Sequence, residues 1–411
     1  MLKTSIRLCT LVAVIFFSLF GCGQKESKEG PRKLLMWLIG SESQAKAVQS
    51  IGDEFFKDKG VTFRCEAISW GNAHTKYLTS IAGDVVSDIG TMGLTWGTEF
   101  GNLGAMVDLA KRFSSDLKNI KEITFPGLSE SIDYREKVYG IPFDMSLQIM
   151  FYRNDIIPNP PKTWIELADL LKTLEIQEKG MIIDWGSMSW IGYAPYLWQA
   201  GGDFYNKEGT KLALDSKEAV EALKFFASLY TDLGVPRTSI PLEQGMRIGD
   251  FPLAISGNWK IDSLRASAPE IMGKWSIALL PAGPTGKQTA FVGGRTMGIF
   301  NKSKNIDIAW EFIKFLFTPD IQVRLYEAAC EAQDSYLPSN MLAWNTLPME
   351  PEFKKILKLQ AQDTKGPPSV FGWDESTRFI EHAIQKVILQ GSDAKQELSR
   401  AVMEIEAYAK R

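Results

Sequence analysis

Histidine and cysteine are scarce in this sequence, and their scarcity argues against several kinds of active site. The 411 residues include two histidines, His74 and His382, and four cysteines. Because the histidines lie far apart in the chain, we expect neither a histidine-dependent catalytic triad nor a histidine-rich metal site. We interpret both as surface residues whose ring nitrogens have hydrogen-bond partners. No pair of carboxylates can be assigned to acid and base roles, so no catalytic residue, metal or cofactor is predicted, and we do not expect an enzyme.

The sequence also lacks a cluster of positive charge and a second long apolar run. Its formal net charge is −3 at pH 7, and loss of a leader carrying Lys3 and Arg7 would lower it to −5. A mildly acidic chain without a basic segment is not expected to bind nucleic acid. Beyond the N-terminus, no stretch has the roughly 20 apolar residues that cross a bilayer.

The N-terminus has the pattern of an export signal. Lys3 and Arg7 precede an apolar run over residues 8–20, which is too short to span a membrane. The run ends in a sequence that resembles the bacterial lipobox, Leu19, Phe20, Gly21 and Cys22. We therefore predict a lipoprotein signal peptide at 1–21, a lipid on Cys22 that attaches the protein to the membrane, and a polar tether at 22–32. A cleaved signal with an incidental cysteine is the alternative.

Two cysteines, Cys65 and Cys330, remain in the predicted mature chain. Cys65 lies in residues 61–67, where apolar and polar residues alternate, so its side chain is expected to point inward from a strand. No disulfide framework is evident, and we predict buried free thiols. A disulfide between the two is the alternative.

Length and periodicity indicate two α/β lobes. About 390 residues follow the predicted signal, more than the roughly 250–300 at which one core usually divides. Strand patterns at 34–38, 61–67 and 88–92 alternate with helical faces, which predicts a parallel sheet covered by helices. Ligands of such sheets bind in the loops after the strands. Here those loops are residues 40–42, 70–72 and 95–96.

The C-terminal part continues the same pattern. Residues 163–166 and 215–218 each place a glutamate three residues after a capping residue, which is typical of a helix start. Further helices are predicted at 305–317, at 318–330 and at 375–410, the last interrupted at 390–392.

Several short stretches occur in a distinctive order along the chain. They are 139–144 (beginning Tyr139, Gly140, Ile141, Pro142), 150–155, 158–167, 197–203, 254–259 (ending Gly257, Asn258, Trp259), 291–294, 309–316 and 337–340. Together they resemble the extracellular solute-binding proteins of carbohydrate ABC transporters, a group that includes maltodextrin-binding proteins. One departure is Ser87, which stands where the family often has proline before the third strand.

The resemblance implies a type II periplasmic-binding-protein fold, with a ligand cleft between two lobes. Each lobe would be a mostly parallel sheet flanked by helices. Chain crossings would lie near 143–146, 289–292 and 335–339. Lobe 1 would then contain 33–143 plus 293–334, and lobe 2 would contain 144–292 plus 335–411. Closure would be a hinge motion that a ligand favours by contacting both lobes.

The resemblance also suggests aromatic residues that would contact a ligand. A sugar presents apolar faces to aromatic rings and hydroxyls to polar groups. Trp259 resembles the family's stacking residue; a core tryptophan supporting the hinge is the alternative. The other aromatic candidates are Trp37, Trp70, Trp185, Trp190, Trp198 and Trp373. Among those of lobe 1, Trp37 is the one more expected in the core, and Trp164 and Trp310 are interpreted as structural.

Polar residues and glycines complete the predicted site. Asp144 would accept hydrogen bonds from hydroxyls or cap the hinge. Asn72 lies beyond the second strand. Gly293 and Gly294 would bring backbone close to the ligand or form a plain turn. Arg295 would pair with a hydroxyl, an acidic sugar or a surface carboxylate.

The implied function is that of a lipid-anchored solute-binding protein of an ABC importer. It would capture a sugar, expected to be an oligosaccharide, and deliver it to the permease subunits. We expect a monomer located in the periplasm or on the outer face of the cytoplasmic membrane. A polyamine, an iron complex or a sugar phosphate is the alternative ligand, although no paired-tyrosine motif of the iron-site type is present. A surface glycosidase, which needs only two placed carboxylates, and a structural lipoprotein are alternatives from other classes.

Overall fold

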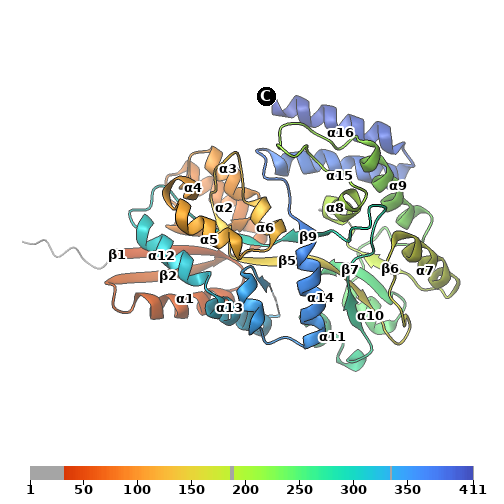
Figure 1. Ribbon diagram of the computed structural model, residues 1–411, viewed down its shortest axis with the longest axis horizontal. Helices are drawn as coiled ribbons and strands as arrows, with labels where there is room; N and C mark the ends of the chain where they lie inside the picture. The colour runs from red at the N-terminus through yellow and green to blue at the C-terminus, as the bar shows by residue number, and fades with distance from the viewer. Residues whose placement is uncertain (1–31, 186–188, 334–335, 411) are drawn as a thin grey trace, which may run out of the picture.

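The chain forms two α/β lobes joined at their centre, as the computed structural model shows (Figure 1). The structure describes residues 32–185, 189–333 and 336–410. The predicted signal peptide, Cys22 and the predicted tether up to residue 31 lie outside the described residues. Within the described part of the chain, none of the helices combines the length and the apolar character that crossing a membrane requires.

Lobe 1 is built on a five-stranded sheet in the order β2-β1-β3-β10-β4. β1 is parallel to β2 and β3, as predicted, whereas β10 runs antiparallel to β3 and β4. The strands are β1 (Arg32–Ile39), β2 (Val61–Ile68), β3 (Ile89–Gly93), β4 (Ile141–Pro142) and β10 (Arg295–Ile299). The helices are α1 (Glu42–Phe56), α2 (Trp70–Ala82), α3 (Trp96–Asn102), α4 (Leu109–Arg112), α5 (Ser114–Glu122), α6 (Pro126–Ser131), α12 (Ile306–Leu316) and α13 (Pro319–Glu331).

Lobe 2 contains a mixed sheet in the order β12-β9-β5-β7-β6, with β8 and β11 also paired to β5. β6 and β7 are parallel, but β5 runs antiparallel to its neighbours because it enters from lobe 1. The strands are β5 (Asp144–Tyr152), β6 (Met181–Ile183), β7 (Leu253–Gly257), β8 (Ser276–Ala278), β9 (Ala290–Gly293), β11 (Leu337–Pro338) and β12 (Thr364–Lys365). The helices are α7 (Trp164–Ile176), α8 (Ser189–Gln199), α9 (Lys217–Thr231), α10 (Leu242–Ile248), α11 (Lys260–Ser267), α14 (Pro351–Gln362), α15 (Trp373–Gln390) and α16 (Ala394–Ala409), with 3-10 turns at Pro269–Ile271 and Met341–Asn345.

The helix starts follow the capping chemistry that the sequence indicated, with one shift. Thr163 Oγ1 accepts a hydrogen bond from the Glu166 backbone N–H, and the Glu166 carboxylate accepts one from the backbone N–H of Lys162. At α9 the cap is Ser216, whose Oγ accepts from the Ala219 N–H, one residue later than the predicted box began. Such caps stabilise a helix by about 1 kcal/mol each.

The hydrophobic cores account for two tryptophans and both described cysteines. Trp164 and Trp310 are buried, and their ring N–H groups donate to Gln199 Oε1 and Asp116 Oδ2, which confirms their structural role. Cys65 and Cys330 are free and partly buried, so the free-thiol prediction is confirmed and the disulfide alternative is wrong. Burial raises the pKa of Cys65 to about 12, which keeps this thiol unreactive at neutral pH.

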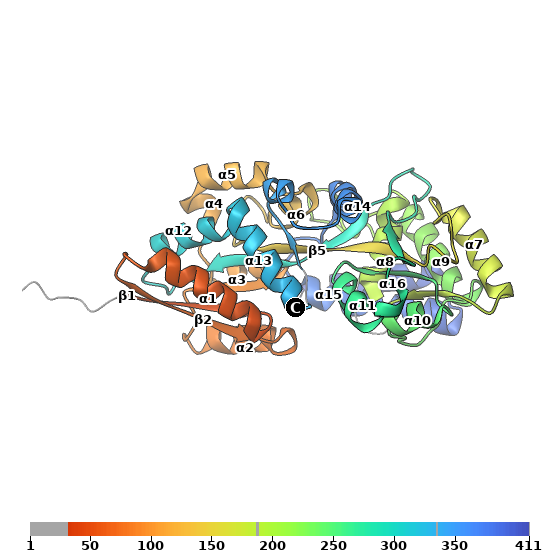
Figure 2. The same cartoon turned by 90° about the horizontal axis from the view of Figure 1, so that it is seen from below.

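Three segments lie side by side where the lobes meet, at the centre of the long axis in Figure 2. Leu337 of β11 pairs with Met145 of β5, and Ser146 of β5 pairs with Gly293 of β9. Gly294 follows at φ +134°, and a Cβ there would lie 2.4 Å from the carbonyl oxygen of Asp144. Only glycine fits both this dihedral angle and this approach of two strands.

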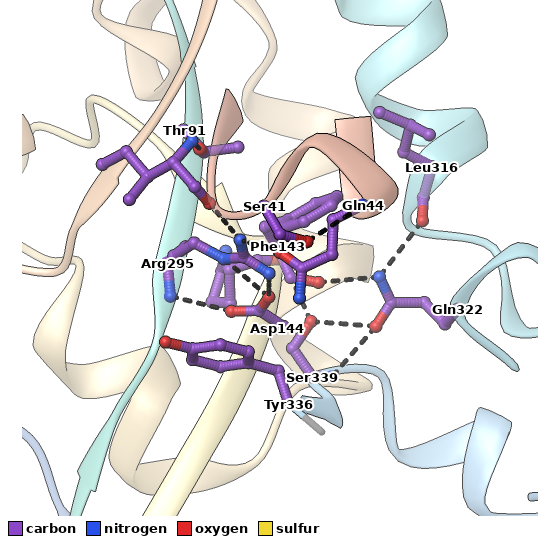
Figure 3. A network of polar contacts seen from close by, with 12 residues as sticks. Ser41, Gln44, Thr91, Phe143, Asp144, Arg295, Leu316, Gln322, Tyr336 and Ser339 are labelled. Atoms are coloured by element: carbon purple, nitrogen blue, oxygen red, sulfur yellow. Dashed lines mark hydrogen bonds and ion pairs between the residues drawn. The ribbon is translucent and has the colours of Figure 1, made fainter. Parts of the chain in front are cut away.

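A buried ion pair ties these crossings together (Figure 3). Arg295 donates from its backbone N–H to Asp144 Oδ1 at 3.0 Å and from Nε to Asp144 Oδ2 at 2.8 Å; Nη2 also donates to Oδ2. Its Nη1 donates to the carbonyl of Ile39 at the end of β1 and to Gln44 Oε1. The guanidinium lies 4.4 Å from the ring centre of Tyr336, which adds a cation–π contact.

A second buried network holds α13 of lobe 1 to the same crossings (Figure 3). Gln322 Nε2 donates to the carbonyl oxygens of Phe143 at 2.8 Å and Leu316 at 3.1 Å. Gln322 Oε1 accepts from the backbone N–H of Ser339 at 3.0 Å, and Ser339 Oγ donates to the carbonyl of Pro142. The crossing segments therefore have fixed partners on lobe 1.

Gly294→Ala should destabilise the protein more than Gly286→Ala. Both glycines have positive φ, but a Cβ at Gly286 meets nothing within 4 Å, whereas at Gly294 it meets the β5 backbone. The shared dihedral strain costs about 1–2 kcal/mol, and we expect the clash to add at least about 1 kcal/mol. Urea unfolding midpoints measure the difference; equal losses would contradict this account of the crossing.

Breaking the Asp144–Arg295 pair from one side should cost more than replacing both partners. Asp144→Asn leaves a buried guanidinium without its carboxylate, and we expect a loss of about 3–5 kcal/mol. The double variant Asp144→Leu/Arg295→Met should lose less than either single variant, because no unpaired charge remains. The exposed pair of Asp84 and Lys302 is the control: Asp84→Asn should cost under about 1 kcal/mol. Strictly additive losses at the buried pair would disprove the coupling.

Candidate binding site between the lobes

The carboxyl ends of the parallel strands of both lobes point to the lobe junction. In lobe 1, Gly93 at the end of β3 pairs with Arg295. In lobe 2, Gly257 at the end of β7 pairs with Gln148, close to the start of β5. Loops after such strand ends are where ligands of α/β sheets bind. We call the residues that follow these strand ends, together with the polar side of β5, the interlobe site.

Aromatic rings form the lobe 1 side of the interlobe site. Trp70 begins α2 directly after β2, and Trp96 begins α3 after β3. Their rings meet edge to face with centres 5.8 Å apart, and Trp70 remains 39% exposed. Trp70 Nε1 donates to the hydroxyl of Tyr336 at 3.1 Å. Tyr336 precedes β11, so this hydrogen bond fixes Trp70 to a crossing segment.

Trp259 and Asp184 form the lobe 2 side. Asp184 follows β6 and Trp259 follows β7, and the two strands are parallel neighbours. Trp259 is 37% exposed, and its ring lies directly on Gly257, where a Cβ would come within 2.0 Å of it. Ser256 Oγ donates to Asp184 Oδ2 at 3.1 Å. The tryptophan face and the carboxylate thus stand at adjacent strand ends.

β5 contributes a row of polar side chains between the two sides. Asp144, Ser146 and Gln148 alternate with apolar residues that belong to a core cluster, so the three share one face of the strand. All three are buried. Gln148 Oε1 has no hydrogen-bond partner in the described structure. A buried acceptor without a partner costs about 1–3 kcal/mol, which a ligand donor would recover.

The interlobe site places carboxylates in an unusual environment. Asp184 follows β6, and Asp374 lies in the first turn of α15. The side chains of both residues reach solvent. Nevertheless the surrounding protein removes enough water to raise the pKa of each carboxyl above its ordinary value. Both carboxyls therefore reach solvent while neighbouring protein atoms disfavour their charged form. Such perturbed carboxylates are frequent at binding sites.

The lobes also touch directly beside this site. Thr95 Oγ1 donates to Asp374 Oδ1 at 3.3 Å, and Thr98 Oγ1 hydrogen-bonds with Ser369 Oγ at 2.9 Å. Both threonines lie at the start of α3 in lobe 1. Ser369 lies in the segment that leads into α15, and Asp374 lies in the first turn of that helix. The described conformation therefore has the two lobes in contact.

Four predicted stacking residues are buried in the lobe cores. Their exposed fractions are 7% or less: Trp37, Trp190, Trp198 and Trp373. Trp190 packs edge to face against Trp373 with ring centres 5.1 Å apart. Helix periodicity places Trp190 and Trp198 on the inner side of α8, where aromatic packing of the lobe 2 core competes with ligand contact. In this conformation the four rings are packed inside the lobes, and a ligand role for them stays a prediction; Trp37 is the one that was expected in the core.

The predicted polar residues and glycines lie at the hinge. Asp144 and Arg295 satisfy each other within the hinge, so Asp144 caps the hinge and Arg295 is buried rather than paired at the surface. Gly294 allows the close approach of two strands, whereas a Cβ at Gly293 would meet only the side chains of Phe291 and Ser146. Contact of either glycine with a ligand stays a prediction. His74 is partly exposed and its Nε2 lies 2.7 Å from Glu99 Oε2, so it is a histidine with a polar partner near the surface, as predicted. His382 is exposed, as predicted.

Two further predicted residues lie at the edge of the site. Asn72 is exposed in the first turn of α2, and Trp185 is partly buried with its ring 5.0 Å from that of Tyr230. The residues of the interlobe site that the prediction omitted are Trp96, Ser146, Gln148, Asp184 and Tyr336. The alternation of Asp144, Ser146 and Gln148 in an otherwise apolar strand was the available signal for Gln148. The contact between Trp70 and Tyr336 spans 266 positions and leaves no local signal.

A large groove between the lobes lies elsewhere. It has a volume of about 780 Å³ and is lined by Asn102 and Tyr134 of lobe 1, Tyr205 and Asp203 of lobe 2, and residues 365–371. None of the residues that follow β1, β2, β3, β6 or β7 lines it. It therefore lacks the strand-end position at which such folds bind ligands.

Comparison with known proteins agrees with this arrangement. A family model described as bacterial extracellular solute-binding protein matches residues 32–346. A Brucella abortus protein, named only as a binding protein, is 25% identical over 375 residues, covering 86% of this chain and 87% of that protein. An arabinooligosaccharide-binding protein of Bacillus subtilis is 23% identical over 343 residues, 77% of this chain and 76% of that protein.

Solved structures show the same fold. The sugar-binding protein MalE from Xanthomonas citri superimposes with a TM-score of 0.81 at 21% identity, covering 92% of this chain and 98% of that chain. The likeness confirms the two-lobed periplasmic-binding-protein fold. Because the family model spans most of the chain, this protein belongs to the bacterial extracellular solute-binding proteins.

Proposed function

We propose that this protein binds a sugar, expected to be an oligosaccharide, and delivers it to the permease of an ABC importer. The observation that carries the proposal is the pairing of exposed tryptophan faces, Trp70 and Trp259, with polar groups at strand ends of the two lobes. Relatives named for maltotriose and arabinooligosaccharide binding support a sugar as ligand.

The chemistry of the interlobe site suits a sugar. The flat rings of Trp70, Trp96 and Trp259 would cover the apolar C–H faces of pyranose rings. Gln148 Oε1 and the Asp184 carboxylate would accept hydrogen bonds from hydroxyls at the rim. Among the described residues that follow the strand ends, no tyrosine pair suggests an iron complex.

Hinge closure would couple binding to transport. The crossing segments are the connections that would have to bend, and the Asp144–Arg295 pair would serve as the pivot from which both lobes are positioned. A ligand favours the closed state only by the contacts that it adds across the lobes. We assign lobe 1 to 33–143 plus 293–334 and lobe 2 to 144–292 plus 335–411.

We further propose that Cys22 carries a lipid that anchors the protein outside the cytoplasm, as a monomer, in the periplasm or on the outer face of the cytoplasmic membrane. The support is the sequence pattern before Cys22, together with the family, whose name describes extracellular proteins. We infer that the protein binds its ligand without converting it, since the relatives are named as binding proteins.

A ligand screen by thermal shift tests the function. The purified protein is heated with mono- and oligosaccharides, sugar phosphates, polyamines and iron complexes. A ligand at a hundredfold excess over Kd should stabilise the native state by about 2.7 kcal/mol. A shift with one sugar class, with the sugar recovered intact, supports the proposal. A shift only with a polyamine or an iron complex would show that the ligand is not a sugar. Recovery of cleaved sugar would show that the protein is an enzyme.

Trp259→Ala should weaken sugar binding by at least about tenfold, equivalent to about 1.4 kcal/mol. The variant removes a stacking face without disturbing a buried core. Gly257→Ala should have a similar effect, because its Cβ would displace the Trp259 ring. Tyr408→Ala is the matched control, since Tyr408 is 42% exposed on α16, away from the strand ends. Calorimetric titration measures Kd, and equal affinities in all variants would remove Trp259 from the site.

Asp184→Asn should make the ligand-free protein more stable than wild type at neutral pH. In acid the difference in stability between the variant and wild type should become smaller. Burial raises the pKa of Asp184, so the folded state favours its protonated form. In the wild-type protein, the contribution of Asp184 to stability is therefore fully present below the unfolded-state pKa of about 3.9. It is lost as pH rises through the folded-state pKa.

Asp155→Asn provides the control of opposite sign. The hydrogen bond from Arg153 lowers the pKa of Asp155, so its contribution is present at neutral pH and is lost as pH falls. Melting temperatures from pH 3 to pH 8 should therefore diverge in opposite directions for the two variants. If the melting temperatures of the two variants change with pH in the same way, Asp184 is not desolvated.

A further inference from the structure

Three side chains from three helices meet beside the interlobe site. His74 lies on α2 and Glu99 on α3, both in lobe 1, whereas Asp374 lies in the first turn of α15 in lobe 2. Each offers one ligand atom, and these atoms all lie within 4.8 Å of one another. His74 Nε2 and Glu99 Oε2 are 2.7 Å apart. Figure 1 shows α2 and α3 on the side of lobe 1 that faces α15.

The cluster has an excess of negative charge. Within the described chain, no lysine or arginine forms an ion pair with Glu99 or Asp374. When His74 is neutral, the two carboxylates therefore face each other without a compensating cation. The hydrogen bond to Glu99 raises the pKa of His74, and burial raises the pKa of Asp374.

The three ligands and the residues around them suit a transition-metal ion. One imidazole and two carboxylates form a set that Zn²⁺ accepts, at about 2.0–2.2 Å from each donor atom. The His74 ring is held against Trp96 and Phe100, at centre distances of 4.9 and 5.9 Å. Thr95 Oγ1 orients the Asp374 carboxylate from outside, as supporting residues do around metal ligands.

We propose that His74, Glu99 and Asp374 bind a divalent transition-metal ion, with Zn²⁺ as the representative, that links lobe 1 to lobe 2. Three protein ligands leave the fourth tetrahedral position for water or for an oxygen of a bound solute. Because Asp374 comes from lobe 2 and the other two ligands from lobe 1, an ion bound by all three would favour the arrangement in which the lobes touch. This inference does not depend on the identity of the transported solute.

Calorimetric titration of the full chain with ZnCl₂, after removal of metal by EDTA, tests the site. We expect one equivalent to bind, and we expect His74→Ala and Asp374→Asn each to weaken binding at least about tenfold. His382→Ala is the matched control, because it removes the other histidine, which is exposed, and it should bind zinc as wild type does. Thermal melts establish that the variants fold, and His74→Gln replaces His74→Ala if the latter does not.

Small-angle scattering gives a second, independent measurement. Zinc should lower the radius of gyration of the sugar-free wild-type protein but not that of Asp374→Asn, which lacks the lobe 2 ligand. The proposal would be overturned if the wild-type protein does not bind zinc. It would also be overturned if the His74 and Asp374 variants both bind zinc with the affinity of wild type. Loss of sugar affinity in Asp374→Asn without any zinc binding in wild type would also overturn it, by assigning the cluster to the solute instead.

Discussion

The geometry of this protein depends on a charged pair buried at the point where the chain crosses between its lobes. Asp144 is the first residue of β5 and Arg295 the first of β10, so their contact joins the strand that leaves lobe 1 to the strand that returns to it. Both charges are shielded from water, and each would be costly without the other. Arg295 extends this contact to Ile39 and Gln44, at the start of the loop and helix that follow β1.

That pair also sets the direction of the strands on either side. β5 leads outward into lobe 2, so its antiparallel neighbour β7 must end near the junction. β10 leads outward into lobe 1, so β3 must also end there. The loops with ligand-binding potential therefore face each other as a consequence of strand direction. Trp70 and Trp96 on one lobe and Asp184 and Trp259 on the other occupy these positions.

Some groups in this site lower the stability of the ligand-free protein and are suited to binding a ligand. Gln148 has a buried acceptor without a partner, and Asp184 is held in surroundings that disfavour its charge. Neither arrangement helps the folded protein on its own. Such unfavourable groups are expected where a ligand completes the hydrogen bonds. The aromatic residues Trp190, Trp198 and Trp373 instead pack in the lobe 2 core, where they contribute to its stability.

The sequence by itself determined the elements that depend on local spacing and local chemistry. The period of the apolar residues predicted α1 and the first three strands, and the capping residues predicted α7 and α9, because both signals act within a few positions. Only the tertiary structure decided which polar and aromatic residues remain available. The partner of Asp144 lies 151 positions away and that of Trp70 lies 266 positions away, so no local pattern records them. Likewise, whether a tryptophan faces a core or the lobe junction depends on which helix covers it, and that is fixed by packing between distant segments.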